Sequence, residues 1–267
     1  MGRRIEGIRE IMTGVPRSIR AALDCACLTS QWPAEALAEL AAQSELRQYR
    51  DGERVAAAGD PIDAVWIVTE GSFIQSRTWQ NGRRLLYSYL RAGQSAGVLA
   101  VLDRLPAVFD VTARGNGTMV VLGGEVLRAL IRKYPVAARE TMLYLCRRIR
   151  TDYDVIELHA MNSVRCRIAK SLLWIARGNS PSGDGEMTID TRLSQEDLAD
   201  IVCAARQSVN RELRRLMKEG IIQQRYRAII IADRRRLMEI GGEDESFSLG
   251  AHMPIDTAFG DLYPAAD

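Results

Sequence analysis

The apolar residues that follow Leu193 recur at helical spacing in two short runs separated by a small gap. Positions three and four apart fall on one face of a helix, so each run predicts a short amphipathic helix. The two apolar faces would meet across a tight turn and form one small core. The positions that would form it are Leu198, Ile201, Val202, Val209, Leu213 and Leu216.

A β-hairpin is predicted directly after the second helix. Gly220 suits the end of that helix, because glycine adopts a left-handed conformation without a steric cost. Residues 221–231 then contain two isoleucine-rich runs separated by a polar, basic turn, which is the pattern of two short strands. Two helices followed by a basic hairpin are the layout of a winged helix-turn-helix that binds DNA.

Long polar side chains lie on the outward face of the second predicted helix. In a helix-turn-helix this helix enters the major groove, where arginine pairs with guanine and glutamine with adenine. Arg206, Gln207 and Arg211 are therefore predicted to read bases. The alternative interpretation is an ordinary helix pair with a solvated basic face. Contacts to phosphate, which position a protein without specifying sequence, are predicted for Ser208, Arg225 and Arg227.

Residues 46–122 have a different sequence pattern, in which short β-rich runs alternate with glycine-bearing turns. This pattern predicts a small all-β sandwich or barrel. Its clearest hairpin turn is Asn81-Gly82, a pair that favours a tight connection between antiparallel strands. Residues 1–45 are expected to form helical segments around Gly14-Val15-Pro16 and Trp32-Pro33.

Helical periodicity returns between residues 126 and 159, with a break at Pro135. After the break, apolar positions alternate four and three apart, which is the seam of a coiled coil. Such a helix needs a partner helix, and a two-fold dimer would give a DNA-binding protein two recognition helices. The alternative is that the seam packs on the chain's own β-domain. The seam consists of Met142, Cys146, Ile149, Tyr153, Ile156 and Ala160.

Composition narrows the class of protein. With 267 residues, of which 47% are hydrophobic, the chain can bury two modest cores. No apolar run approaches the ~20 residues that span a bilayer, and no apolar secretory segment is found, so we expect a cytoplasmic protein without membrane contact. The formal net charge of +2 combines a basic winged helix with an acidic tail after Gly241, which is expected to be mobile.

The sequence contains few residues that suit a disulfide, a metal or cofactor site, or a catalytic site. The five cysteines are mostly far apart, which argues against a disulfide framework, so free thiols are expected. The close pair Cys25 and Cys27 is too little for an iron-sulfur cluster, and His159 and His252 are the two histidines available to a haem or a zinc ion. No nucleophile and base lie at motif spacing, and no glycine-rich phosphate loop precedes a helix. We therefore expect neither a metal nor a cofactor, and no enzymatic activity.

A β-domain, a long helix and a winged helix in this order resemble the Crp/Fnr family of bacterial transcription regulators, over about residues 46–240. The resemblance is strongest in the glycine spacing from Gly52 to Gly97 and in the segment Ala205–Arg211. It implies an α+β fold, with an N-terminal β-roll (a jelly roll of the cyclic-nucleotide-binding type), a dimerisation helix and a C-terminal winged helix-turn-helix. These parts would be residues 46–134, 135–160 and 161–240, after an N-terminal helical segment, 1–45, and before a tail, 241–267.

The resemblance also implies a homodimer that binds double-stranded DNA and works with RNA polymerase, and it puts Arg206, Gln207 and Arg211 at the family's base-contact positions. Two departures lie nearby. Cys203 stands where the turn usually has glycine, and Ala205 replaces the usual hydroxyl cap of the recognition helix, at a cost of ~1 kcal/mol. We expect Cys203 to be a small buried apolar residue, with a redox-sensitive thiol as the alternative.

The region that would bind an effector departs further. Family members that bind cyclic nucleotides use a Gly-Glu-Leu turn and a following Arg-Ser pair, whereas this chain has Gly97-Val98-Leu99 and then Ala107-Val108-Phe109-Asp110. A buried phosphate needs a cation, so cyclic AMP is not expected to bind in the family's usual manner. A different effector, no effector, and control through cysteine thiols remain open. The residues of a possible effector pocket are Gly97, Val98, Leu99, Phe109, Asp110, Asp152 and Tyr153.

Overall fold

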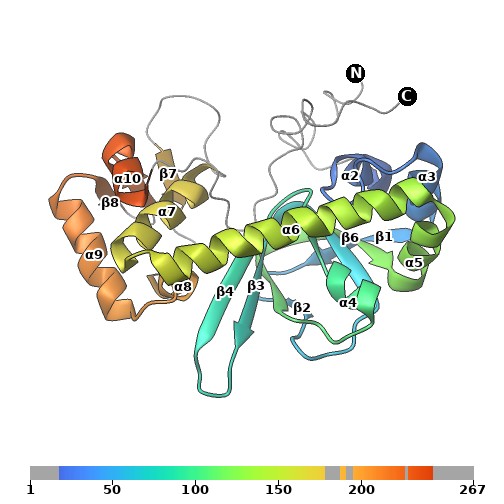
Figure 1. The fold of residues 1–267 in the computed structure, drawn as a ribbon, viewed down its shortest axis with the longest axis horizontal. Coiled ribbons are helices and arrows are strands. Elements are labelled where there is room, and N and C mark those ends of the chain that lie inside the picture. Colours follow the sequence, from blue (N-terminus) through green and yellow to red (C-terminus); the bar gives the residue numbers. More distant parts are fainter. Residues whose placement is uncertain (1–17, 178–186, 191–194, 226–227, 243–267) are drawn as a thin grey trace. The chain divides into compact units, whose positions relative to one another are not determined.

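The computed structural model describes residues 18–177, 187–190, 195–225 and 228–242 (Figure 1). The segment around Gly14-Val15-Pro16 and the acidic tail after residue 242 lie outside these ranges. The chain forms two compact units. The first contains the described residues up to Arg77 together with Ser88–Ile149, and the second contains Thr78–Tyr87 and the described residues from Arg150 onward.

An antiparallel sheet is the centre of the first unit and confirms the all-β prediction for this part of the chain. Its main path has the order β1-β6-β3-β4, with β2 paired to β6 and β5 paired to β3. Gly82, with φ of +76°, lies in the tight connection between β3 and β4, as the Asn81-Gly82 pair predicts. The strands are β1 (Ser44–Tyr49), β2 (Arg54–Ala56), β3 (Ala64–Thr78), β4 (Arg84–Leu90), β5 (Ser95–Ala96) and β6 (Asp110–Gly123).

Two hydrophobic clusters stabilise this unit. Val65 and Ile67 belong to one cluster, while Trp66 and Val68 belong to the other. Successive residues of a strand point to opposite faces, so the clusters lie on the two faces of the sheet. Helices complete the first cluster, and Pro33 is the N-cap residue of the second helix, α3. These helices are α2 (Ile19–Cys25), α3 (Ala34–Ala42), α4 (Val98–Asp103) and α5 (Gly124–Lys133).

The long helix α6 (Pro135–Met161) begins at the predicted break, because proline is accepted at the first position of a helix. The division between the two units falls within it, after Ile149. Its buried residues include Tyr144 and Leu158. The predicted seam faces solvent: Met142, Ile149, Tyr153 and Ile156 are 60%, 51%, 66% and 61% exposed, respectively. The alternative, that the seam packs on the chain's own β-domain, is therefore wrong.

The second unit contains the predicted helix-turn-helix and hairpin (Figure 1). The predicted core is confirmed, since each of its six residues is at most 5% exposed. A three-stranded sheet of order β7-β9-β8 extends the hairpin by a strand that the sequence pattern did not predict. The elements are α7 (Val164–Arg177), β7 (Met187–Asp190), α8 (Gln195–Ile201), α9 (Arg206–Lys218), β8 (Ile222–Arg225), β9 (Ala228–Ile231) and α10 (Arg234–Gly241).

Candidate nucleic-acid interface and sensor region

The turn between α8 and α9 is held in a conformation that favours glycine. Cys203 has a φ of +48°, and the next residue, Ala204, donates a backbone hydrogen bond to the carbonyl of Ala199 at 3.1 Å. A side chain in this left-handed region is strained, so the turn is less favourable with cysteine than with glycine. Cys203 is exposed, which corrects the expectation that it is buried.

The N-terminus of α9 lacks a side-chain cap. Ala205 occupies the N-cap position and makes no side-chain hydrogen bond, although its carbonyl accepts from the amides of Ser208 and Val209 at 2.8 and 3.1 Å. The amides at this end of a helix carry a partial positive charge. An anion near α9 would therefore meet uncapped donors as well as side chains.

The predicted base-reading residues share the outer surface of α9. Arg206 and Gln207 are exposed at its first turn, and the side chain of Arg211 is 75% exposed one turn later. The ion pair between Arg211 and Glu212 is long, at 3.8 Å, and so constrains the guanidinium little. Together these side chains form a solvent-facing set of hydrogen-bond donors suited to the edges of bases.

Only two of the three residues that are predicted to contact phosphate lie among the described residues. Ser208 is half-buried in the first turn of α9, and Arg225 is exposed at the end of β8. Arg227 lies outside the described residues. The sequence interpretation left out Arg214, an exposed arginine on α9 one turn after Asn210. Its position on a strongly amphipathic helix is the signal that could have identified it.

The C-terminal end of α9 is fixed to its neighbours by arginines around Glu219. Arg165 of α7 donates a short hydrogen bond to the Glu219 carboxylate, and Arg215 lies 3.3 Å from its other oxygen. Arg236 of α10 donates to the Glu219 carbonyl at 3.2 Å. The hydrogen bond from Arg165 is the main cause that lowers the pKa of Glu219 below its ordinary value of 4.5. Gly220 follows with a φ of +72°, as predicted for the end of this helix.

In the first unit, the position directly before α4 accepts only glycine. Gly97 has a φ of +85°, and a Cβ atom there would lie 2.5 Å from the carbonyl oxygen of Ala64 and 3.0 Å from the Trp66 ring. Val98 is 5% exposed and packs in the hydrophobic core, whereas Leu99 is 52% exposed. The turn therefore offers solvent an apolar side chain and no carboxylate.

Polar groups of residues 107–110 form hydrogen bonds that stabilise the loop at residues 58–60. The amide of Ala107 donates to the carbonyl of Asp60 at 2.9 Å, and the amide of Gly59 donates to the carbonyl of Ala107 at 2.7 Å. The carboxylate of Asp110 accepts from the amide of Ala58 at 3.1 Å. Phe109 is half-buried between them in sequence. These contacts are structural, and none of these side chains is a cation.

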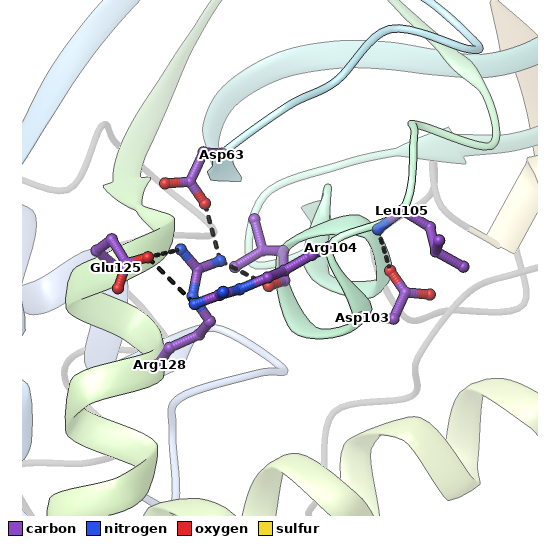
Figure 2. Close-up of polar contacts among 7 residues, drawn as sticks. Asp63, Asp103, Arg104, Leu105, Glu125 and Arg128 are labelled. Atoms are coloured by element: carbon purple, nitrogen blue, oxygen red, sulfur yellow. Dashed lines mark hydrogen bonds and ion pairs between the residues drawn. The ribbon is translucent and has the colours of Figure 1, made fainter.

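Arginines near this segment pair with carboxylates (Figure 2). Arg104, which ends α4 with a φ of +59°, lies 3.4 Å from Glu125. Arg128 lies 2.8 Å from Asp63 and 2.7 Å from Glu125, and it donates to the Val101 carbonyl at 2.7 Å. Both guanidinium groups are thus held by acidic neighbours on α5 and in the loop before β3.

A separate polar chain involves β3, β4 and α6. Ser88 donates to the side-chain oxygen of Gln75 at 2.8 Å, and Arg148 donates to the same oxygen at 3.3 Å. The sequence analysis did not identify these residues. A possible signal was the presence of the polar residues Gln75 and Ser88 within segments that are otherwise rich in apolar strand residues. Of the two predicted α6 residues, Asp152 accepts a short hydrogen bond from the hydroxyl of Tyr87, and Tyr153 is exposed.

The five cysteines are free thiols. Burial raises the pKa of the Cys27 thiol to about 11 and also raises the pKa of Cys166, and partial desolvation of the sulfur raises the pKa of Cys203, although this residue is exposed as a whole. Among the described residues, no group of three or more histidine, cysteine, aspartate or glutamate side chains is placed to hold a metal ion. None of the described helices is both long and apolar enough to cross a membrane.

Two family models match the chain in separate segments. The model of the cyclic nucleotide-binding domain matches residues 46–134, and that of the Crp-like helix-turn-helix domain matches residues 166–240. The CRP-like cAMP-activated global transcriptional regulator of Mycobacterium tuberculosis is 27% identical over 76% of this chain and 90% of its own length. The transcriptional activator protein FnrL of Cereibacter sphaeroides is 25% identical over 88% of this chain and 97% of its own length.

Solved structures show the same fold. FixK2 from Bradyrhizobium japonicum superposes with a TM-score of 0.65 at 20% identity, over 74% of this chain and 98% of its own. The c-di-GMP responsive global regulator CLP of Xanthomonas campestris gives a TM-score of 0.64 at 20% identity, over 74% of this chain and 99% of its own.

Proposed function

Because the chain belongs to the Crp/Fnr family of transcription regulators, we propose that it acts as a homodimer that reads a specific DNA sequence through α9. In this proposal residues 46–134 form the sensor domain, 135–160 the dimerisation helix and 161–240 the DNA-binding domain. RNA polymerase, which the family resemblance implies as a partner, would be the target of the regulation.

The observation that carries this proposal is the solvent-facing set Arg206, Gln207 and Arg211 on α9. Base-contacting arginines in such a helix are each worth about 1–3 kcal/mol of discrimination. Selection of binding sites from a random DNA pool, followed by a gel shift on the enriched sequence, tests it. We expect Arg206→Ala to weaken binding to that sequence by about fivefold to a hundredfold and to relax the preference at one position.

A matched control is available on α10. Arg235 is also an exposed arginine, with its side chain 90% exposed, and pairs with Glu239 at 3.5 Å. Arg235→Ala removes the same charge and should leave sequence preference unchanged. If Arg206→Ala and Arg235→Ala behave alike on every sequence, α9 does not read bases through Arg206.

The exposed seam of α6 supports the dimer. A row of large apolar side chains that is half or more exposed loses its contact with water only when a second helix covers it. A second copy of the same helix matches this row by symmetry.

For the sensor domain we propose that cyclic AMP is not bound in the family's usual manner. The support is chemical: Val98 is in the core, Asp110 braces a loop, and Arg104 is paired with Glu125. A phosphate placed here would be desolvated without a cation. Calorimetric titration with cyclic AMP should show no binding at micromolar concentrations, and tight binding would contradict the proposal.

A ligand-independent regulator remains compatible with these residues. Control through cysteine thiols is the less favoured alternative, because the thiolate is the reactive form and full or partial desolvation raises the pKa of Cys27, Cys166 and Cys203. A panel of cyclic mononucleotides and dinucleotides in the same calorimetric experiment separates a different effector from none.

A further inference from the structure

The tip of the β3–β4 hairpin, residues Thr78–Tyr87, belongs to the second compact unit together with the helix-turn-helix. Arg84 holds it there. Its guanidinium lies 3.6 Å from the carboxylate of Asp197 and 3.4 Å from that of Asp200, both on α8. Asp197 is 3% exposed, and the nearby guanidinium replaces part of the water that its carboxylate would otherwise contact.

A second contact anchors the same segment. The hydroxyl of Tyr87 donates a short hydrogen bond to Asp152 of α6. Within the second unit, the hairpin tip is thus attached to α8 by Arg84 and to α6 by Tyr87. Its connecting turn is tight, with the amide of Trp79 donating to the carbonyl of Arg83 at 2.9 Å.

The side chain of Arg83 takes no part in these contacts. It is exposed, and within the part of the chain that the structure describes it forms no ion pair. The adjacent residue Arg84 pairs with Asp200, which lies three residues before Cys203 of the α8–α9 turn. In agreement with this, the charge of Arg83 is one of those that lower the pKa of the Cys203 thiol against its partial desolvation. Arg83 therefore lies close to the turn that leads into α9.

The first helix of a helix-turn-helix crosses the sugar-phosphate backbone when the second enters the groove. A basic hairpin fixed to α8 and close to the turn is then next to phosphate. We propose that Arg83 contacts a DNA phosphate as an additional, sequence-independent clamp, and that Arg84 is the positioning residue that holds the hairpin against α8. This inference rests on the proposed function, since it requires that α9 bind the groove.

Salt dependence gives a direct test, because each neutralised phosphate contributes about 0.9 to the slope of log K against log salt concentration. The full-length protein is titrated with a short random-sequence duplex at several salt concentrations. We expect Arg83→Gln to weaken binding about threefold to tenfold at low salt and to reduce the slope by about 0.9 for each hairpin that engages. Between about 50 and 200 mM salt, the advantage of the unmodified protein should shrink about threefold per hairpin.

Two matched variants control for fold and for net charge. Arg83→Lys keeps the cation and should keep the slope. Arg54→Gln removes an exposed arginine from β2 in the first unit and should leave the slope unchanged. If Arg83→Gln keeps the original slope, or if Arg54→Gln lowers it equally, the clamp is overturned. Failure of the unmodified protein to bind any duplex would instead overturn the proposed function.

The role of Arg84 is tested by a double-mutant cycle. If Arg84 positions the hairpin, Arg83→Gln should cost little in a chain that already carries Arg84→Gln, and Arg84→Lys should restore part of the loss. Additive losses from the two substitutions would overturn the positioning role of Arg84.

Discussion

Arg128 on α5 lies 2.8 Å from the carboxylate of Asp63, in the loop before β3. The arginine is almost buried, while the side chain of Asp63 is 57% exposed. The approach of the two depends on Gly124, because a Cβ atom there would lie 2.0 Å from the Asp63 carboxylate. A charged side chain thus joins the start of α5 to a loop and to the end of α4 (Figure 2).

Removing this arginine should destabilise the first unit. Arg128→Ala deletes two hydrogen bonds and the ion pair with Asp63 and leaves the Val101 carbonyl without its donor, whereas the exposed carboxylates can rehydrate. We expect a loss of about 1–3 kcal/mol in the free energy of unfolding, measured by urea denaturation. Arg104→Ala is the control, because it removes a 3.4 Å surface pair to the same Glu125 and should cost less than about 1 kcal/mol. Equal costs would show that Arg128 makes no more than a surface contact.

Substituting the left-handed residue of the α8–α9 turn should stabilise the second unit. Cys203→Gly removes a side chain from a backbone conformation with φ of +48° that glycine adopts freely. The expected gain is on the order of 1 kcal/mol, measured as a raised thermal unfolding midpoint. Cys203→Ala keeps a Cβ atom and should give no comparable gain. A stabilised alanine variant together with an unchanged glycine variant would contradict this explanation.

A charge in the seam of α6 should separate the proposed dimer. Ile149→Glu places a carboxylate in an apolar row that is solvent-exposed in a single chain, so folding should survive while association is lost. Analytical ultracentrifugation should show a shift from dimer to monomer. Arg150→Glu changes an exposed neighbour outside the seam and should leave the dimer intact. A dimer that persists in Ile149→Glu would place the interface elsewhere.

Acid should weaken the attachment of α9 at Glu219. Its folded pKa is lowered, chiefly by the hydrogen bond from Arg165, so its contribution to stability is present above the ordinary value of 4.5. That contribution is lost as the pH falls below 4.5 and through the lower folded pKa. Thermal unfolding midpoints between neutral pH and strong acid should fall less steeply for Glu219→Gln than for the unmodified protein.

The control for this pH dependence is Glu239→Gln, which changes an exposed glutamate paired with Arg235 on α10. It should leave the acid profile as it is. If Glu219→Gln and the unmodified protein lose stability in parallel, the arginines around Glu219 do not stabilise its charged form.

The sequence predicted those elements that depend on local patterns. The two-helix core around Leu198 and Val209, the tight turn at Gly82 and the break at Pro135 all follow from periodicity or from backbone preferences of single residues. The exposed surface of α9 follows from the same periodicity, because a buried stripe on one side fixes what faces outward.

Contacts between distant parts of the chain could not be predicted in this way. Arg84 meets Asp197 only because the fold brings a hairpin and α8 together, and nothing in either local pattern specifies that pairing. The strand β7 is short, and it becomes a strand through its ladder with β9. The exposure of Cys203 was also not predicted, because the apolar character of a small side chain does not specify which neighbours the fold places around it.

The burial of Val98 limits which side chains this turn can accept. A glutamate introduced there to hold a ribose would enter a packed core, and an unpaired charge in such a place costs several kcal/mol. The neighbouring Gly97 cannot carry the carboxylate instead, because a Cβ atom there would lie 2.5 Å from the Ala64 carbonyl oxygen and 3.0 Å from the Trp66 ring. A carboxylate could therefore not be placed at this turn by exchanging one side chain without a loss of stability.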